Sequence, residues 1–372
     1  MSERGVRQTG VALLMTLSII LILSIALMKT FENRSVETAH LANSLQRFQA
    51  ETLSRSIFRA ILITIRTKKL AFVIQNTTSW KGVPIPFNNN QYFQINEIKP
   101  IDHLFNLNRR FRPDDPWPRV FLNIINKLRK EKDEFDIPLD IEDTNPVLSA
   151  INDWTDWDTD PDDQFFSDNY EGYQEMNPEF IVKNRGLDRL SEVKLIPPFQ
   201  ELGLTHENIW DNFRVFLIDK SSEKQFIDIN LATHAYNDKD DELEKFLNSF
   251  KDVEGYSAVF ENKEKIRNIL KERDEELGYD EELGGVLDPK IRFPLPIDNK
   301  DYTWKKMLEN EGITFNGDEH GLFSGKTKHL SISFSVAVSE VIVTTEAIVE
   351  VIYPSENELT IKGFEIISYS MQ

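Results

Sequence analysis

The chain contains neither glycine nor proline between Val11 and Lys81, and this uninterrupted stretch begins with an apolar run. Residues 11–28 include no charged side chain. An α-helix rises about 1.5 Å per residue, so this run spans about 27 Å, close to the hydrocarbon thickness of a bilayer. The sequence therefore predicts a transmembrane helix over 11–28.

After Met28 the apolar residues continue at intervals of three to five positions, which is typical of one face of a helix. They are Phe31, Val36, Leu41, Leu45, Phe48, Leu53, Ile57, Ile61 and Ile65. We therefore expect one long helix over 11–69, half in lipid and half amphipathic. The alternative is a cleaved secretory signal with a loose cleavage site at Ser24 to Ala26, but a removable signal needs no such continuation.

Two basic residues, Arg4 and Arg7, precede the apolar run. Positively charged flanks stay on the cytoplasmic side, so the bulk of the chain is expected across the membrane. The chain has 372 residues, a formal net charge of −19 and no cysteine. This acidity argues against nucleic-acid binding, which needs a basic face, and suits either cation binding or solubility alone. The lack of cysteine excludes disulfides, zinc thiolates and cysteine nucleophiles.

Strand patterns lie on both sides of a mostly helical region. Short strands are expected at 71–74 and 92–95, separated by a turn-rich stretch, and three alternating segments follow at 330–338, 341–353 and 359–369. We therefore predict an α+β fold, in which the long N-terminal helix packs on an antiparallel sheet and a large, mostly α-helical domain is inserted into that sheet. The expected parts are a leader at 1–10, the helix at 11–69, the first part of the β domain at 70–108, the insert at 109–322 and closing strands at 323–372. Within the insert, helices are expected around 120–128, 240–250 and 261–277.

The most distinctive segment of the insert is acidic. Six aspartates lie within eleven positions, namely Asp153, Asp156, Asp158, Asp160, Asp162 and Asp163. Carboxylates held this close repel one another unless a cation neutralises them, and clustered oxygens suit calcium, which takes six to eight oxygen ligands. The glycine and closing glutamate of an EF-hand loop are missing at the required spacing. The alternative is an acidic surface loop with Trp154 and Trp157 in the core.

The N-terminus resembles a known signal. A short basic leader ends in Gly10, and the apolar helix begins directly with Val11-Ala12-Leu13-Leu14. This arrangement is similar to the class III signal of type IV pilins and type II secretion pseudopilins, which a prepilin peptidase cleaves after the glycine, here between Gly10 and Val11. Most members carry a glutamate at the fifth residue after the cut, where this chain has Met15. The large minor pseudopilin K typically lacks that glutamate.

Further matches occur in order along the chain. Asp153-Trp154-Thr155-Asp156-Trp157-Asp158 resembles the Asp-Trp-Ile-Asp-x-Asp motif of the general secretion pathway protein K family. Weaker matches are Phe105 to Asn108, Met176 to Pro178, Asn184 to Gly186, Leu190 to Val193, Ile227 to Thr233 and Leu322 to Ser324. We expect the asparagines and aspartate of 105–108 and 227–230 to shape the backbone. The resemblance implies a calcium site, in which Asp168 or Glu171 replaces a family glutamate.

The resemblance implies a minor pseudopilin at the tip of the type II secretion pseudopilus, anchored in the inner membrane with its bulk in the periplasm and methylated at its new N-terminus. The implied partners are minor pseudopilins of the I and J types, the major pseudopilin and the prepilin peptidase. A minor pilin of a type IV pilus and a membrane-tethered metal-dependent hydrolase are the alternatives. An enzyme is not expected, because the chain lacks nucleophile-elbow, Walker and dinucleotide motifs and its six histidines show no ligand spacing.

Overall fold

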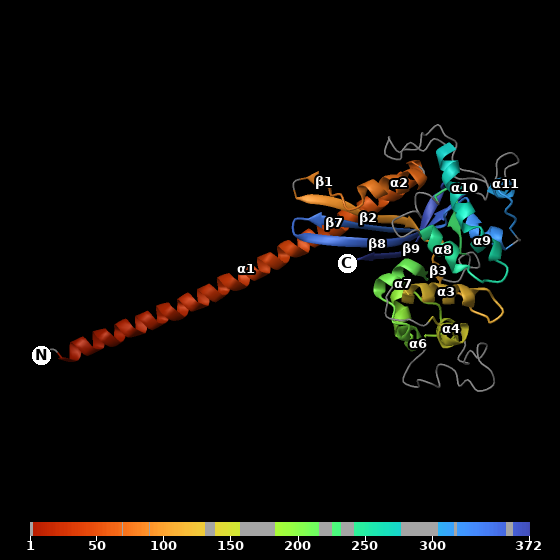
Figure 1. Cartoon of the computed structure of the whole chain (residues 1–372). Coiled ribbons are helices and arrows are strands. Elements are labelled where there is room, and N and C mark those ends of the chain that lie inside the picture. The colour runs from red at the N-terminus through yellow and green to blue at the C-terminus, as the bar shows by residue number, and fades with distance from the viewer. Residues whose placement is uncertain are drawn as a thin grey trace.

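The structure is a computed structural model in which one very long helix leads into a mixed helical and β body (Figure 1). It describes residues 3–68, 70–88, 90–130, 138–156, 183–215, 225–231, 242–276, 304–315, 318–354 and 360–372. Helix α1 runs over Glu3–Lys68 and α2 over Leu70–Trp80. The lack of proline throughout α1, and of glycine after Gly10, allows this length, because no residue interrupts the backbone hydrogen bonds.

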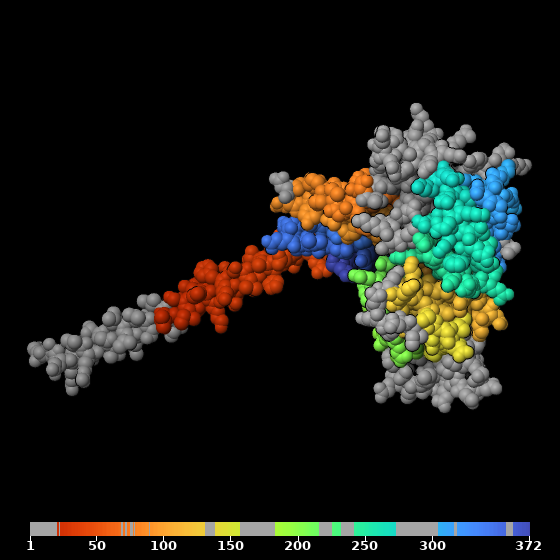
Figure 2. Space-filling view, in the orientation of Figure 1, coloured from red at the N-terminus to blue at the C-terminus, as the bar shows by residue number. Residues whose placement is uncertain are grey.

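Only the C-terminal part of α1 packs against the rest of the chain. Ala50, Ile57, Phe58, Ile61 and Ile65 are buried on the side that contacts the sheet. The preceding part of the helix projects away from the body as a single rod (Figures 1 and 2). Within this chain, the C-terminal part of the helix is therefore packed on the sheet, and the longer preceding part, as far as its side chains are described, makes no contact with the body.

The expected strand at 71–74 is wrong, because these residues belong to α2. Leu70, Val73, Ile74 and Thr77 are buried, and their spacing of three and four is that of one helix face. A short apolar run can form either a buried strand or a helix, and here the packing of α2 on the sheet decides for the helix.

The sheet has five strands in the order β1-β2-β7-β8-β9, and every neighbouring pair is antiparallel. The strands are β1 Ile85–Asn88, β2 Gln91–Pro100, β7 His329–Val338, β8 Val341–Ile352 and β9 Gly363–Met371. Strands β2 and β7 are neighbours although 228 residues separate Pro100 from His329. The predicted α+β class, with a helical domain inserted into one antiparallel sheet, is confirmed.

The inner face of the sheet covers α1. Ile332, Phe334 and Val336 of β7 are buried there, and the ring of Phe58 on α1 lies 5.3 Å from that of Tyr369 on β9. The hydroxyls of Ser54 and Thr345 form a buried hydrogen bond across the same interface. Strand β1 occupies part of the stretch expected to be turns, and its proline, Pro86, is tolerated because β1 is an edge strand.

The insert lies between β2 and β7 and is mainly helical. Its elements are β3 Phe105–Asn106, α3 Trp117–Lys130, α4 Ile141–Thr155, η1 Leu190–Leu195, α6 Pro197–Glu201, α7 His206–Asn212, β4 Phe213–Arg214, β5 Ile227–Asp228, α8 Glu242–Ser249, α9 Ser257–Glu261, α10 Lys263–Glu276, α11 Trp304–Asn310, η3 Glu319–Leu322 and β6 Phe323–Ser324. Helices α3, α8 and α10 confirm the three helices expected there. Phe105 centres an aromatic cluster, with Phe111 and Phe121 each 5.8 Å away and Phe213 at 6.2 Å.

Two short parallel strand pairs were not predicted. Strand β3 pairs with β4, and β5 pairs with β6. The two segments that begin these pairs, 105–108 and 227–230, contain the same local hydrogen bond. In each, the side-chain oxygen of an asparagine or aspartate accepts the backbone N–H of the residue two positions later. Asn106 Oδ1 accepts from Asn108 at 3.1 Å, and Asp228 Oδ1 accepts from Asn230 at 3.0 Å. These bonds are consistent with the backbone-shaping role expected for both segments.

Candidate functional sites

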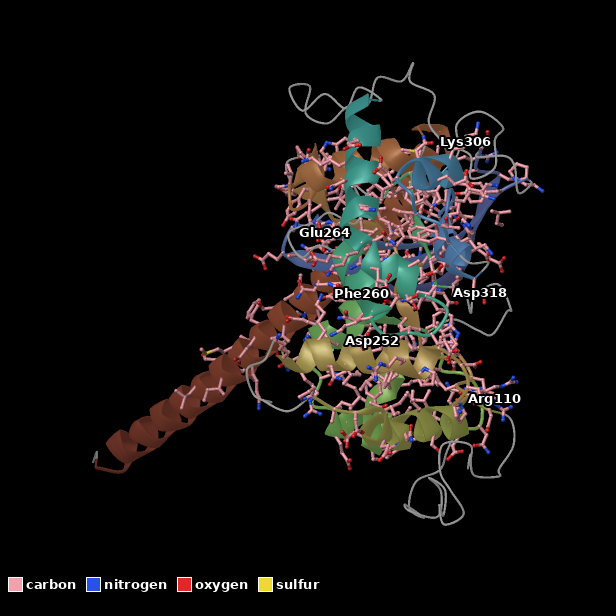
Figure 3. All side chains as sticks on the ribbon, turned by 45° about the vertical axis from the view of Figure 1, so that its right-hand side comes forward. Arg110, Asp252, Phe260, Glu264, Lys306 and Asp318 are labelled. Carbon is pink, nitrogen blue, oxygen red and sulfur yellow. The ribbon has the colours of Figure 1, made fainter. Side chains whose placement is uncertain are left out.

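The projecting half of α1 carries an unusual number of exposed apolar side chains, which stand clear of the rest of the molecule (Figure 3). Phe31, Leu41 and Phe48 are 70%, 72% and 66% exposed. The others are Leu21, Leu23, Ile25, Leu27, Met28, Val36 and Leu45. Singly exposed apolar residues are ordinary, but these ten along one projecting helix indicate a surface that another molecule covers.

The exposed apolar residues nearest the body, Leu41, Leu45 and Phe48, do not lie on the side of α1 that faces the sheet. Successive residues of an α-helix turn by about 100°, so Leu41, Leu45 and Phe48 fall within an arc of about 60°. That arc lies roughly opposite the buried Ala50 and Ile57. The exposed apolar side of α1 therefore faces away from its own sheet, so this sheet does not cover it.

The predicted transmembrane span is largely untested. Among the residues whose side chains the structure describes, no helix is long and apolar enough to cross a membrane. Residues 11–20 and Ile22, which make up most of the predicted span, lie outside that part of the chain. The side chains of Val11 and Met15, and Gly10 before them, also lie outside the described side chains, although the backbone there is helical within α1.

The acidic segment begins at the C-terminal end of α4, and its residues from 157 onward lie outside the described residues. Asp153 is buried in the last turn, and Asp156, the C-cap residue, is half-buried. The N–H of Arg185 donates to the carbonyl of Trp154 at 3.3 Å, so the chain re-enters the described structure beside the point where it left. Trp154 is buried, which agrees with the alternative expectation for that residue.

Asp153 and Asp156 are the two candidate ligands that the structure describes. Trp157 and the remaining candidates, Asp158, Asp160, Asp162, Asp163, Asp168 and Glu171, lie outside the described residues. Within the part of the chain that is described, no group of three or more histidine, aspartate or glutamate side chains could hold a metal ion.

The described donors fit a hard cation. Asp153 and Asp156 lie three positions apart, so they project from the same side of the helix end. A helix C-terminus carries partial negative charge, which disfavours carboxylates and favours cations. The last turn of α4 has no basic residue to offset this charge. A cation bound at this end of α4 would offset the charge of these carboxylates and of the helix terminus.

A buried ionic cluster joins the sheet to the insert, and sequence reasoning missed it. Asp102 follows β2, His329 begins β7 and Arg214 lies in β4. Asp102 Oδ1 lies 2.7 Å from Nδ1 of His329 and 3.3 Å from Nη1 of Arg214. Its Oδ2 accepts the N–H of Lys328 at 2.8 Å and that of His329 at 3.1 Å. No sequence pattern links positions so far apart, and only the order of the strands brings them together.

The electrostatics of Asp102 keep it ionised. Burial opposes the charged carboxylate, but the hydrogen bond and charge of His329 and the charge of Arg214 outweigh this, so the pKa of Asp102 is lowered. An ionised carboxylate is only an acceptor, so Nδ1 of His329 is the donor. Nearby, Thr327 donates to Asp228 at 2.8 Å and the hydroxyl of Tyr353 donates to the Thr327 carbonyl at 2.9 Å.

A second ionic group flanks this cluster. Glu242 at the start of α8 lies 3.3 Å from Nε2 of His103 and 3.9 Å from Nζ of Lys99. Burial raises the pKa of Glu242, but the hydrogen bond and charge of His103, with Lys99 and Lys245, lower it to about 2. The Asp102 group links the end of β2 to β4 and β7, and the Glu242 group links the end of β2 to α8. They act as structural links between the sheet and the insert.

Asparagine side chains close the insert in three places. Asn152 bonds the backbone of Phe111 with both amide atoms at 2.9 Å, and Asn108 does the same for Leu187 at 2.7 and 2.9 Å. Asn126 holds Leu139 through two bonds of 2.8 Å. The matched segments at 105–108 and 184–186 thus meet around Asn108. These motifs therefore hold the backbone of the insert together.

No family model matches the chain, and no curated protein matches it. Among solved structures, it is similar to a chain of the GspK–GspI–GspJ complex from the type 2 secretion system of enterotoxigenic Escherichia coli. The two chains share 13% identity. The alignment covers 88% of this chain and 98% of that chain, with a TM-score of 0.43.

Proposed function

We propose that this protein is a minor pseudopilin of a type II secretion system, held in the inner membrane by residues 11–28 with its bulk in the periplasm. The observation that carries this proposal is the dual character of α1. One side of its C-terminal part is buried against the sheet, while described residues of the projecting part, from Leu21 to Phe48, expose apolar side chains. A subunit that assembles through helix packing needs such an element.

The resemblance of the leader and of the motifs at 105–108, 153–158 and 227–233 supports the same function. Their structural setting agrees with it, because 105–108 and 227–230 begin the two parallel strand pairs at the base of the insert. We propose that the protein acts at the tip of the pseudopilus with minor subunits of the I and J types. The inserted domain, which is large compared with the sheet, would then block addition of a further subunit above it.

We further propose that calcium binds the acidic segment through Asp153, Asp156 and carboxylates of the following residues. The bound ion would neutralise the negative charge at the C-terminal end of α4 and hold the segment in one conformation. In this proposal the role of the ion is structural.

The mature N-terminus tests the proposed function. The full chain is expressed in a bacterium with its own prepilin peptidase and purified from the membrane, and its terminus is sequenced. We expect Val11 as the first residue, N-methylated, and we expect the Gly10→Asp variant to retain the leader. A terminus at Leu27, after Ala26, would show a cleaved secretory signal and sink the proposal. Co-purification of major pilin subunits in place of pseudopilins would favour a type IV pilus.

A further inference from the structure

The charge of the chain is divided unevenly. Residues 1–96 carry eleven lysines and arginines and four acidic residues, whereas the remainder has a net charge of −26. No acidic residue occurs between Glu51 and Glu97. The C-terminal half of α1 is therefore a basic element within a strongly acidic protein.

Three arginines of this half form a row on the surface. Arg55, Arg59 and Arg66 are exposed. At about 100° per residue they fall within an arc of about 40°, on the side of α1 that faces away from the sheet. Ile63, which is 62% exposed, lies beside them. We call these four residues the basic seam.

The arginines of the seam have no ionic partner in the described parts of the chain. There, no carboxylate lies within the 4.0 Å limit of an ion pair with any of them. Arg47, just over two turns before Arg55 and on another side of the helix, pairs with Glu51 at 3.1 Å. Three arginines in line that pair with none of the described carboxylates, in a chain with 62 acidic residues, form a surface complementary to carboxylates of another molecule.

The spacing of the seam fits another helix. Leu41, Leu45, Phe48, Thr52, Arg55 and Arg59 follow one another at alternating intervals of four and three, as in the contact line of two helices packed at a shallow angle. The apolar and basic parts are therefore one continuous line. A partner helix that covers the apolar part must pass over the arginines.

Two other occupants are disfavoured. If residues 11–28 span the membrane, Arg55 stands about 40 Å beyond Met28, whereas the headgroup layer is only about 5–8 Å thick, so lipid phosphates are out of reach. A second copy of this chain anchored in the same membrane would run parallel and bring arginine rows against each other, which is repulsive.

We propose that the basic seam binds the acidic face of a helix from a different membrane-anchored subunit, whose carboxylates pair with Arg55, Arg59 and Arg66. This inference rests on the proposed function and specifies the chemistry of one of its partners. The apolar part of the line supplies contact area. The arginines select the partner and set its height along α1, because carboxylates must lie at matching helical positions over about 16 Å.

The test uses the full chain in its own membrane, with a photo-cross-linking amino acid in place of Ile63. We expect an adduct with one other protein, mapped to a helix that carries aspartate or glutamate at the cross-linked site. The variant Arg55→Glu/Arg59→Glu/Arg66→Glu should reduce the adduct about tenfold. Glutamate and arginine have similar helix propensities, so α1 should persist. Replacing the mapped carboxylates of the partner by arginine should then restore the adduct.

The matched control is Lys194→Glu/Lys271→Glu/Lys305→Glu, which changes the net charge equally at exposed sites of the insert. It should leave the adduct intact. If the seam variant fails to fold, the parent chain with its three arginines still provides a test. Raising the salt concentration from about 0.05 to about 0.5 M should weaken its adduct through screening. A phospholipid adduct, an adduct with a second copy, no adduct, or one insensitive to both salt and charge would overturn the inference. A mature terminus at Val11 alongside such a result would leave the proposed function standing.

Discussion

The carboxylate of Asp102 accepts a hydrogen bond of 2.7 Å from Nδ1 of His329, although the two residues are 227 positions apart. Asp102 follows the last strand before the insert, and His329 opens the first strand after it. The pair therefore closes the insert at its base. With Arg214 it forms a buried ionic group at the point where the sheet and the insert meet.

Replacement of Asp102 by asparagine should destabilise the protein strongly. The side chain keeps its shape but loses its charge, so Arg214 and His329 lose the carboxylate that they share. Breaking a buried ion pair in this way typically costs about 3–5 kcal/mol. Denaturant unfolding of the variant against the parent chain measures the loss.

The matched control is Asp188→Asn. Asp188 also pairs with basic residues, Lys183 at 2.8 Å and Arg185 at 3.2 Å, but its side chain is 49% exposed. Surface pairs of this kind contribute about 0–1 kcal/mol. Equal losses for the two variants would show that the Asp102 group is not the tie between sheet and insert.

Acid should weaken the junction over a defined range of pH. The pKa of Glu242 is about 2 in the folded chain and 4.5 as its ordinary value, so its ionised form stabilises the fold above pH 4.5. That stability is lost as pH falls from 4.5 towards 2. The lowered pKa of Asp102 acts in the same direction. Thermal midpoints measured across this range should therefore fall steeply.

The variant Glu242→Gln separates the two carboxylates. It should be less stable at neutral pH and show a flatter decline between pH 4.5 and 2, because the titrating group is gone. Glu264→Gln, at an exposed side chain of α10, should follow the parent profile. A parent-like slope for Glu242→Gln would contradict the role given to Glu242.

The side-chain amide of Asn152 should contribute strongly to the free energy of unfolding. Asn152→Ala removes two hydrogen bonds of 2.9 Å and leaves the N–H and carbonyl of Phe111 without that partner. Each unsatisfied buried polar group costs about 1–3 kcal/mol, so we expect a total of about 2–4 kcal/mol in chemical denaturation. Asn96→Ala, whose amide bonds serines on the outer face of the sheet, should cost under about 1 kcal/mol. The reverse order would refute this assignment.

Calcium should stabilise the full chain in detergent after metal removal. A ligand at one hundred times its dissociation constant adds about 2.7 kcal/mol, which calorimetry detects as a rise in the melting midpoint. The variant Asp153→Asn/Asp156→Asn should reduce that rise, while Asp114→Asn/Glu311→Gln, at exposed positions, should not. A midpoint indifferent to both calcium and chelator would remove the metal from the proposal.

The sequence predicted the parts of the fold that depend on local pattern. The helix over α1, the strand at 92–95, the C-terminal meander and helices α3, α8 and α10 all follow from periodicity along one segment. The error at 71–74 has the same origin, since four apolar residues fit a strand or a helix equally well until α2 is packed on β2.

The candidate sites divide in the same way. The apolar residues of α1 can be identified from the sequence, but which of them face the sheet cannot. Whether Leu41 and Phe48 cover the sheet or face away from it depends on which side of α1 the strands bury. The acidic segment can be identified from composition alone, whereas the return of the chain beside Trp154 cannot.

By itself the sequence determined that residues 11–69 are helical, that the chain is acidic except at its N-terminal end, and that strands flank a helical insert. These properties belong to neighbouring residues and follow from their spacing and charge. Only the tertiary structure decided that Asp102, Arg214 and His329 meet, and that the arginines of α1 face away from its own sheet. Contacts between residues more than a hundred positions apart depend on how strands pair and helices pack, and no local pattern encodes those choices.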